Sequence, residues 1–185
     1  MELTYKVEIA GLIRELVVCE VSETTSIAAL ILFGDVELTE KAAEMLLKVA
    51  PEHDIIIAPE AKGIPLAYEM ARQQRNISYI VARKGIKLYM KEVFAVEVQS
   101  ITTRDQQSLY IDAKEAKRME NRRVLIVDDV ISTGESVRAV EALVNKAGGT
   151  VVGRMAILAE GEAKDRGDII YLERIPLLNP DGTPQ

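Results

Sequence analysis

The chain has 185 residues, of which 48% are hydrophobic and 28% charged, a composition typical of a globular protein with one substantial core. Its formal net charge of −6 argues against a nucleic-acid partner, because proteins that bind phosphate backbones usually carry a basic face or stripe. A single cysteine and a single histidine, Cys19 and His53, exclude an internal disulfide, a cysteine-rich metal site and a multi-histidine zinc site.

The N-terminal segment does not predict a secretory signal, because it lacks a basic stretch followed by a long apolar run. The longest apolar run, residues 27–33, is far too short to cross a bilayer. We therefore expect a cytoplasmic protein with no membrane partner.

The first elements predict a hairpin outside the main sheet. Residues 5–9 and 16–21 alternate well enough to be strands, and Ala10 and Gly11 mark the turn between them. Cys19 lies in an apolar run, where a buried structural thiol is expected. At the edge of the next apolar run, Phe33 either stacks on a planar ligand or packs into the core, and the sequence favours neither.

The middle of the chain repeats a strand, a loop and a helix. A helix capped by Thr39 is expected to run to about residue 49. Apolar runs at residues 55–58 and 77–82 predict two strands, and Pro65 suits the first turn of a helix between them. Each strand is followed by a loop with cations and a glycine, which favours an anion at that position. The residues of these loops are Glu60, Ala61, Lys62 and Gly63 in the first, and Arg83, Lys84, Gly85 and Lys87 in the second.

The next region departs from this alternation. Residues 93–101 and 108–111 predict two strands joined by the polar segment 102–107, which has no turn-fixing glycine or proline. Residues 93–111 should therefore form an antiparallel flap with a flexible tip. A short helix is expected at residues 113–119.

Residues 124–136 change character twice. The apolar, β-branched run 124–127 predicts a buried strand of a parallel sheet, which Asp128 and Asp129 should end. These carboxylates would lie where open α/β sheets bind ligands, and they suit sugar hydroxyls or a hydrated cation. Hydroxyls and a glycine at the start of the following helix would cradle a phosphate. They belong to Ser132, Thr133, Gly134, Glu135 and Ser136. A phosphorylated pentose fits this combination.

Two other interpretations of this segment compete with that one. A bare pair of aspartates commonly marks only a strand, a turn and a helix cap. A phospho-acceptor receiver domain also places paired acids after an apolar strand, but on its first strand with most of the domain to follow. Only the last 56 of the 185 residues follow Asp129, so a receiver domain does not fit.

The order of the elements predicts an α/β fold with a doubly wound, mostly parallel sheet, flanking helices and an antiparallel flap. A helix at residues 136–147 and strands at 151–159 and 169–172 complete it, and the polar segment 179–185 is expected to fray. The three loops that carry acids, cations and hydroxyls would then share one edge of the sheet.

The segment 124–136 resembles the phosphoribosyl pyrophosphate (PRPP) signature of type I phosphoribosyltransferases, with four apolar residues, two acids and a loop containing Thr-Gly. The resemblance implies that Asp128 and Asp129 hold the ribose hydroxyls and, directly or through water, Mg²⁺. It also implies that residues 132–136 hold the 5′-phosphate. Because it covers nearly the whole chain, it implies a single domain, 1–185, with an N-terminal hood at residues 1–38.

Three further segments resemble adenine phosphoribosyltransferases. Residues 60–63 are similar to their Glu-Ala-Arg-Gly loop, with Lys62 in place of arginine, and residues 83–88 to their Arg-Lys-Pro-Gly-Lys-Leu segment. Both segments imply contacts to pyrophosphate. Residues 33–35 are similar to the hood sequence Phe-Arg-Asp without its arginine. The resemblance thus implies base contacts by Phe33, Val130 and Ile131, and by the segment after residue 159. It also implies a catalytic set of Asp128, Asp129, Arg83 and Lys87.

Other features resemble enzymes for oxopurines. Residues 98–102 are similar to a segment of xanthine phosphoribosyltransferases and of the purine repressor that shares their fold. The catalytic loop of the adenine enzymes usually contains a glutamate, which is replaced near Thr103 in this chain. Oxopurine enzymes usually place a lysine directly after the last long strand, where this chain has Glu160, and Lys164 comes later. Adenine is therefore favoured, with xanthine, hypoxanthine or guanine as the alternatives.

The implied function is purine salvage, in which 5-phosphoribosyl passes from PRPP to N9 of a purine and gives AMP and pyrophosphate. The resemblance implies a homodimer that uses Mg²⁺ and has no nucleic-acid partner. The alternative from another class is a regulator that binds PRPP without turning it over. Repressors of that kind carry an added DNA-binding domain, and no separate basic domain is visible in this sequence.

Overall fold

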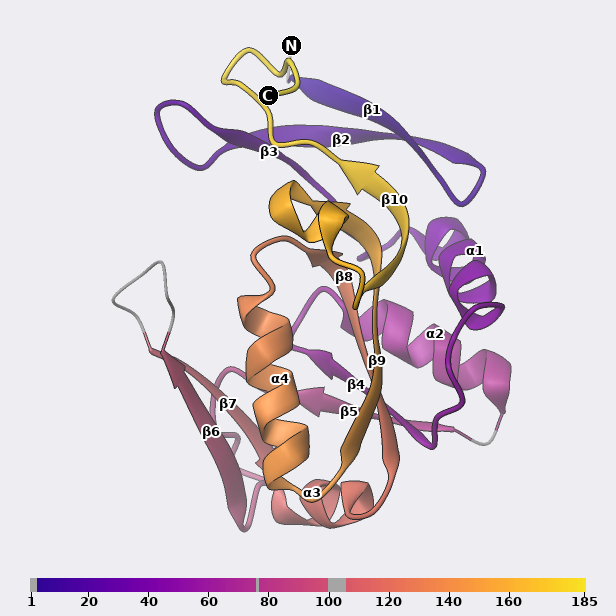
Figure 1. Ribbon diagram of the computed structural model, residues 1–185, viewed down its shortest axis with the longest axis vertical. Helices are drawn as coiled ribbons and strands as arrows, with labels where there is room; N and C mark the ends of the chain where they lie inside the picture. The colour runs from indigo at the N-terminus through magenta and orange to yellow at the C-terminus, as the bar shows by residue number, and fades with distance from the viewer. Residues whose placement is uncertain (1–2, 76, 100–105) are drawn as a thin grey trace.

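The computed structural model describes residues 3–75, 77–99 and 106–185, and its centre is a five-stranded sheet (Figure 1). The strand order is β10–β9–β8–β4–β5, and every neighbouring pair runs parallel. The strands are β4 (Ile55–Pro59), β5 (Ser78–Ala82), β8 (Arg123–Ile131), β9 (Thr150–Glu160) and β10 (Ile170–Ile175). From β4 the chain first adds β5 on one side and later β8 on the other. The strand order therefore reverses between β4 and β8, which is where open α/β sheets bind ligands.

Helices cover both faces of this sheet, so the predicted doubly wound α/β fold is confirmed. Helices α1 (Val36–Leu47) and α2 (Ile64–Gln74) lie on one face, and α4 (Glu135–Lys146) lies on the other. In β4, Ile56 and Ala58 belong to the core under α1 and α2, whereas Ile55 and Ile57 belong to the core under α4. This alternation buries both faces of the strand, which explains why its sequence is continuously apolar.

A three-stranded antiparallel hood lies at the top of Figure 1, above the sheet. It consists of β1 (Thr4–Ile9), β2 (Leu12–Glu20) and β3 (Ser26–Ala29), and the predicted hairpin forms its first two strands. The turn residues Ala10 and Gly11 both have positive φ, 54° and 78°. Cys19 is exposed on β2, so the prediction of a buried thiol is wrong, because the alternation along this strand places Cys19 on the same exposed face as Ile13 and Glu15.

The C-terminal segment is bound to the hood rather than frayed. Leu178 pairs with Ser26 of β3 and with Pro184, and Gln185 Nε2 donates to Thr24 O at 2.8 Å. The expectation of a loose tail was based on its polar sequence, and these hydrogen bonds to a distant strand overturn it.

The flap consists of β6 (Val93–Gln99) and β7 (Gln106–Asp112), which pair antiparallel as predicted. Its base packs against α4, where Lys146 Nζ donates to Ala95 O at 2.7 Å and lies 5.2 Å from the centre of the Phe94 ring. Most of the expected flexible tip, and Thr103 with it, falls outside the described residues. Helix α3 (Ala113–Met119) follows with the predicted bounds.

Helix α1 begins earlier than predicted. Asp35 is its N-cap, and Asp35 Oδ1 accepts from Leu38 N at 3.1 Å. Thr39 lies inside the helix, and its hydroxyl donates to Asp35 O at 2.7 Å. The sequence offers two capping residues four positions apart, and tertiary contacts select the first. No helix in the described ranges is both long and apolar enough to cross a bilayer.

Candidate active site

The paired acids Asp128 and Asp129 lie inside β8 and do not end it. On one side β8 pairs with β9 as far as Ile131, whereas on the other side its pairing with β4 stops at Ile126. The extra ladder with β9 keeps the chain extended through the acids, which is why the predicted strand end is wrong. The acids therefore face the opening between the ends of β4 and β8, where they are held by a strand and not by a loop.

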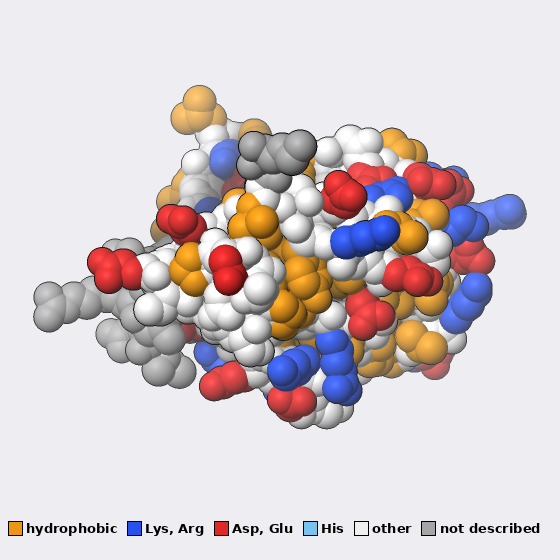
Figure 2. Space-filling view, turned by 90° about the horizontal axis from the view of Figure 1, so that it is seen from above, with side chains coloured by type: hydrophobic (Ala, Val, Ile, Leu, Met, Phe, Trp, Pro, Cys, Tyr) orange, Lys and Arg blue, Asp and Glu red, His pale blue; other side chains and the backbone are white. Residues whose placement is uncertain are grey.

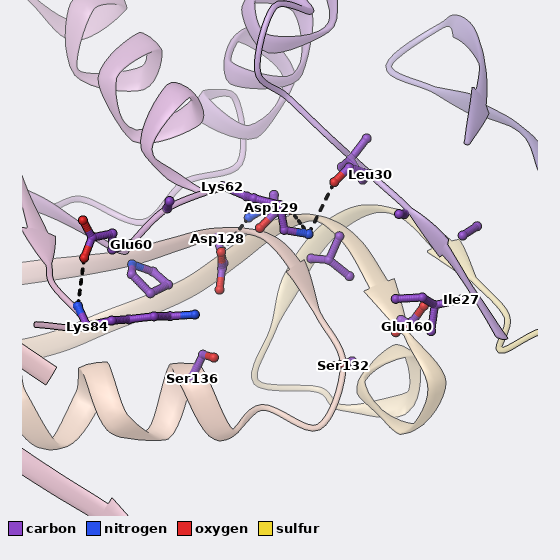
Figure 3. Close-up of a pocket in the computed structure, with 15 residues that line it drawn as sticks. Ile27, Leu30, Glu60, Lys62, Lys84, Asp128, Asp129, Ser132, Ser136 and Glu160 are labelled. Atoms are coloured by element: carbon purple, nitrogen blue, oxygen red, sulfur yellow. Dashed lines mark hydrogen bonds and ion pairs between the residues drawn. The ribbon is translucent and has the colours of Figure 1, made fainter. Parts of the chain in front are cut away.

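The loop after β4 lies directly against this acid pair. A Cβ on Gly63 would lie 2.9 Å from Asp128 Oδ1 and 3.1 Å from Asp128 Cα, so only glycine allows this approach. Lys62 Nζ lies 3.2 Å from Asp129 Oδ2 and 3.4 Å from Leu30 O in the hood (Figure 3). The peptide bond between Glu60 and Ala61 is cis.

The loop after β5 lies against Glu60. Lys84 N donates to Glu60 Oε2 at 2.9 Å, and Glu60 Oε1 lies 3.5 Å from Lys87 Nζ and 3.9 Å from Arg83 Nη1. The Lys84 N–H group, together with the charges of Lys87 and Arg83, lowers the pKa of Glu60. Arg83 Nε is buried without a hydrogen-bond partner among the described residues. Two cationic side chains, Arg83 and Lys87, thus lie beside Glu60, and this cluster retains donors for an anion.

The hydroxyl loop leads into α4. Gly134 is the N-cap of that helix and has a φ of +75°, which a glycine adopts without the cost that a side chain would add. Ser132 and Ser136 face the same cavity as the acid pair, whereas Thr133 and Glu135 line an adjoining hollow.

A cavity of about 410 Å³ joins the acid pair to residues of all three loops, a size within the usual range for small-molecule sites. Arg83 and Lys87 lie beside Glu60 but do not line this cavity. In Figure 3, Glu60 and Lys84 lie at one end, Asp128, Asp129 and Lys62 lie in the middle, and Ile27 and Glu160 lie at the other end. The full lining is Ile27, Ala28, Ala29, Leu30, Pro59, Glu60, Ala61, Lys62, Lys84, Asp128, Asp129, Val130, Ser132, Ser136 and Glu160. One end of the cavity is therefore charged, and the other is mostly apolar.

Of the three residues expected to contact a base, only Val130 lines this cavity. Ile131 is buried in the core under α4, because neighbouring residues of a strand point to opposite faces. Phe33 is 57% exposed and lines a separate hollow with Pro65 and Tyr68. The structure therefore does not bring Phe33 or Ile131 to the acid pair.

Sequence reasoning missed the hood strand as a wall of the cavity. Residues 27–30 form the apolar wall, and their signal was the apolar run itself, which gives no sign of facing a ligand. Glu160 belongs to the segment after residue 159 that was expected near the base, but the sequence assigned no role to its carboxyl.

Burial dominates the electrostatics of the acid pair. The exposed fractions of Asp128 and Asp129 are 8% and 4%. Burial raises the pKa of Asp128 well above its usual range, and the neighbouring charge of Asp129 raises it further. Asp128 Oδ1 accepts from Asp129 N at 2.9 Å, but Asp129 Oδ2 has no hydrogen bond in the described part of the chain. The contact from Lys62 to that oxygen is thus an ion pair without hydrogen-bond geometry, and the oxygen remains available to a ligand.

The acid pair fits a hydrated divalent cation shared with a ligand better than a cation held by protein alone. Two adjacent carboxylates with an unsatisfied buried oxygen supply hard oxygen donors, which Mg²⁺ prefers, and Mg²⁺ usually keeps several waters. In the described ranges, no group of three or more histidine, cysteine or acidic residues forms a complete metal cage.

Known proteins match this chain in sequence and in fold. A family model described as phosphoribosyl transferase domain matches residues 36–175. The adenine phosphoribosyltransferase of Thermotoga sp. (strain RQ2) is 38% identical over 109 residues, which are 59% of this chain and 60% of that protein. The hypoxanthine/guanine phosphoribosyltransferase of Methanococcus voltae is 32% identical over 135 residues, covering 73% of this chain and 68% of its own length.

The crystal structure of adenine phosphoribosyltransferase from Thermoanaerobacter pseudethanolicus has a TM-score of 0.66 and 29% identity. That match covers 78% of this chain and 84% of the other chain. This chain spans about 60% of the length of the first curated relatives that it matches.

Proposed function

The chain belongs to the phosphoribosyl transferase domain family, and on this premise we propose that it is a purine phosphoribosyltransferase that acts on adenine. The observation that carries the proposal is the single cavity in which a buried acid pair, a hydroxyl loop and cationic loops meet an apolar hood strand. PRPP combines a diol, a phosphate and a pyrophosphate, and a purine is a flat and mostly apolar ring. Each part of the cavity suits one of these groups.

In the proposed reaction, N9 of the purine forms a bond to C1′ of PRPP, and the bond from C1′ to pyrophosphate breaks. The imidazole proton of the base passes to the departing pyrophosphate or to water. Asp128 and Asp129 bind the ribose 2′ and 3′ hydroxyls as acceptors, and the loop with Gly134 binds the 5′-phosphate. Lys62, Lys84, Arg83 and Lys87 stabilise the charge that grows on the leaving pyrophosphate. The reaction needs position and charge stabilisation more than a strong nucleophile.

The acid pair is also the proposed place for Mg²⁺. When bound there, Mg²⁺ offsets the charge of pyrophosphate and ribose oxygens. Asp128 and Asp129 would hold it, and the unsatisfied oxygen of Asp129 supports this assignment. Calorimetric titration with PRPP, with and without Mg²⁺, tests the site directly. Absence of binding in both conditions would contradict the proposal.

Adenine is favoured over oxopurines because most of the relatives named are adenine enzymes and no lysine follows β9 directly. The Methanococcus voltae relative keeps hypoxanthine and guanine as the second candidate substrates. The test is a comparison of kcat/KM for adenine, hypoxanthine, guanine and xanthine with PRPP saturating. An oxopurine preference of tenfold or more, about 1.4 kcal/mol in transition-state binding, would overturn the choice of adenine.

A regulator that binds PRPP without turnover is the rival from another class. Figure 2 shows acidic and basic side chains mixed over the hood end of the molecule, without a basic stripe for nucleic acid. Pyrophosphate release with a mixture of purines separates enzyme from regulator, because a regulator binds PRPP and releases none. Light scattering of the protein in solution tests the expected homodimer.

A further inference from the structure

Glu160 is a buried acid in the cavity that the proposed binding of PRPP does not use. It is 6% exposed and lines the cavity from the end of β9. The other buried acids of the described ranges all have a partner. Asp128 accepts from Asp129 N, Asp129 pairs with Lys62, and Glu69 binds Arg72 and Gln73.

No structural role accounts for the Glu160 carboxyl. Glu160 is the N-cap of the 3₁₀ helix η1 (Gly161–Asp165), but its side chain makes no capping hydrogen bond. The nearby cation Lys62 forms its ion pair with Asp129. Over residues 3–75, 77–99 and 106–185, no hydrogen bond or ion pair within 4.0 Å reaches the Glu160 carboxyl. The Glu160 side chain is thus buried in the fold, opens into the cavity and has no protein partner in the described ranges, so it is placed to pair with a group of the ligand.

The place of Glu160 in the cavity indicates which ligand group this is. Figure 3 shows Glu160 with Ile27 at the end away from Glu60 and Lys84, and with Asp128 and Asp129 between the two ends. If the acids hold the ribose, a base attached at C1′ extends toward the apolar wall of Ile27 and Val130. The edge of the base farthest from N9 then meets the only acid at that end of the cavity within the described residues.

We infer that Glu160 is a specificity-determining residue that pairs with the 6-amino group and the adjacent ring nitrogen of the purine base. This inference rests on the proposed function and deepens it, because it assigns one side chain of the cavity to a particular edge of the base. The carboxyl and the amino-substituted ring edge would form two parallel hydrogen bonds.

This pairing needs the neutral form of the Glu160 carboxyl. Burial favours that form because it raises the pKa of the carboxyl, and the positive charge of Lys62 opposes part of that rise. A neutral carboxyl has one donor and one acceptor side by side. Adenine has an N–H donor on its 6-amino group and an acceptor at the neighbouring ring nitrogen, so the two edges are complementary.

The test is a thermodynamic cycle between two proteins and two bases, adenine and unsubstituted purine, which lacks the 6-amino group. The measurement is kcat/KM by pyrophosphate release at saturating PRPP and Mg²⁺. In the parent, loss of the amino group should lower kcat/KM about tenfold, because a polar group of the site loses its partner. In Glu160→Leu the same change of base should lower kcat/KM about twofold or less, since the carboxyl that pairs with the amino group is gone.

Two further variants control this cycle. Glu160→Gln keeps one donor and one acceptor and should restore the adenine-to-purine ratio of the parent. Glu162→Leu removes an exposed acid two residues away and should leave the ratio unchanged. Calorimetry of Glu160→Leu with PRPP and Mg²⁺ should give the parent's Kd, which shows that the rest of the cavity is intact.

Failure of the inference and failure of the proposed function give different results. An active parent whose adenine-to-purine ratio persists in Glu160→Leu contradicts the inference alone. A ratio that Glu160→Gln does not restore also contradicts it, because the pairing needs only the donor and the acceptor. A parent that binds PRPP but turns over no base contradicts the proposed function, and the inference with it.

Discussion

At the scale of single residues, the acid pair shows a conflict between binding and stability. Asp128 and Asp129 are adjacent, buried and close to a single cation, Lys62, within the described residues. Water would solvate these charges better than the protein does, so the arrangement is costly without a ligand. Sites of this kind favour the ligand-bound state at the expense of the free protein.

We therefore expect Asp128→Asn to stabilise the free protein and to weaken PRPP binding. The folded state holds the Asp128 proton more tightly than the unfolded chain, because burial raises the pKa. Between the unfolded pKa of about 3.9 and the higher folded pKa, the native state binds more protons, so stability falls as pH rises. Asparagine does not titrate, so the variant avoids this loss of stability. The Tm of Asp128→Asn without ligand should exceed that of the parent at neutral pH, and the difference in Tm should shrink toward pH 4.

The same variant should weaken PRPP binding by about ten- to hundredfold, because a charged acceptor for a ribose hydroxyl is replaced by a neutral one. Asp54→Asn is the control with the opposite sign. Hydrogen bonds from Arg123 lower the pKa of Asp54 to about 2. Asp54 therefore contributes stability above about pH 4 that is lost as pH falls toward 2. Its replacement should lower Tm at neutral pH and leave PRPP binding unchanged.

The second prediction at this scale concerns the contact between Gly63 and Asp128. In Gly63→Ala the new Cβ would lie 2.9 Å from Asp128 Oδ1 and 3.1 Å from Asp128 Cα, so backbone must move. We expect a loss of about 1–3 kcal/mol in the free energy of unfolding, together with weaker PRPP binding. Urea unfolding and calorimetry measure the two effects. Gly85→Ala is the matched control, because a Cβ there meets nothing within 4 Å, and equal behaviour of the two variants would contradict the prediction.

At the scale of elements, Asp35 joins the hood to the first helix of the main domain. Its carboxylate caps α1 and also accepts from Arg14 of β2, with Nε at 2.6 Å from Oδ2 and Nη2 at 3.0 Å from Oδ1. A bidentate pair to arginine is among the stronger polar contacts. One side chain thus fixes both the start of α1 and the position of the hood strand.

We expect Asp35→Ala to lower the free energy of unfolding by about 1–2 kcal/mol through loss of the cap and of this pair. Asp35→Asn should lower the free energy of unfolding less, since asparagine is an equally good cap. Some loss remains because asparagine has no charge to attract Arg14. The Arg14 hydrogen bonds lower the pKa of Asp35, so its contribution is present above about pH 4 and fades as pH falls. Thermal unfolding at pH 7 and pH 3 checks this. Variants as stable as the parent at pH 7 would show that Asp35 is not the cap.

Element order could be predicted from the sequence, because buried strands and amphipathic helices leave periodic patterns. The bounds of α3 were predicted fully, and those of β4 and β9 nearly so. The continuation of β8 through Asp128 and Asp129 could not be predicted, because it depends on pairing with β9, which lies far along the chain. The choice of Asp35 over Thr39 as a cap likewise depends on Arg14.

The candidate site likewise has one part that could be predicted from the sequence and one part that could not. The charged and hydroxyl-bearing residues could be predicted, since they follow strands whose carboxyl ends meet at one edge of a parallel sheet. The apolar end could not, because Ile27 and Leu30 resemble any core residue until the hood folds over the sheet. Phe33 was chosen for its aromatic ring, but the chain turns at Gly34 and places it in another hollow.

At the scale of the whole molecule, the hood shares its core with the sheet. Ile9, Leu16 and Ala28 belong to the same buried cluster as Leu125 and Val127 of β8. The C-terminal segment ties the hood further, through the pairing of Leu178 with Ser26. Contacts of this kind between the hood and the sheet favour one cooperative unit over two, as the single domain 1–185 expected from the sequence requires.

We therefore expect Ile9→Ala, a change in the hood, to destabilise the hood and the central sheet equally. Ile9 is fully buried, and its truncation should cost about 2–5 kcal/mol in the free energy of unfolding. Native-state hydrogen exchange under increasing urea measures the opening free energies of the amides of β2 and of β8 separately. In a single unit, the opening free energies of β2 and β8 fall by the same amount, because the amides of both strands exchange through the same global unfolding. If β2 loses stability while β8 keeps that of the parent, then the hood opens on its own. Binding of PRPP and adenine would in that case act as the clamp that closes the hood, and it should raise the protection of β2 more than that of β8.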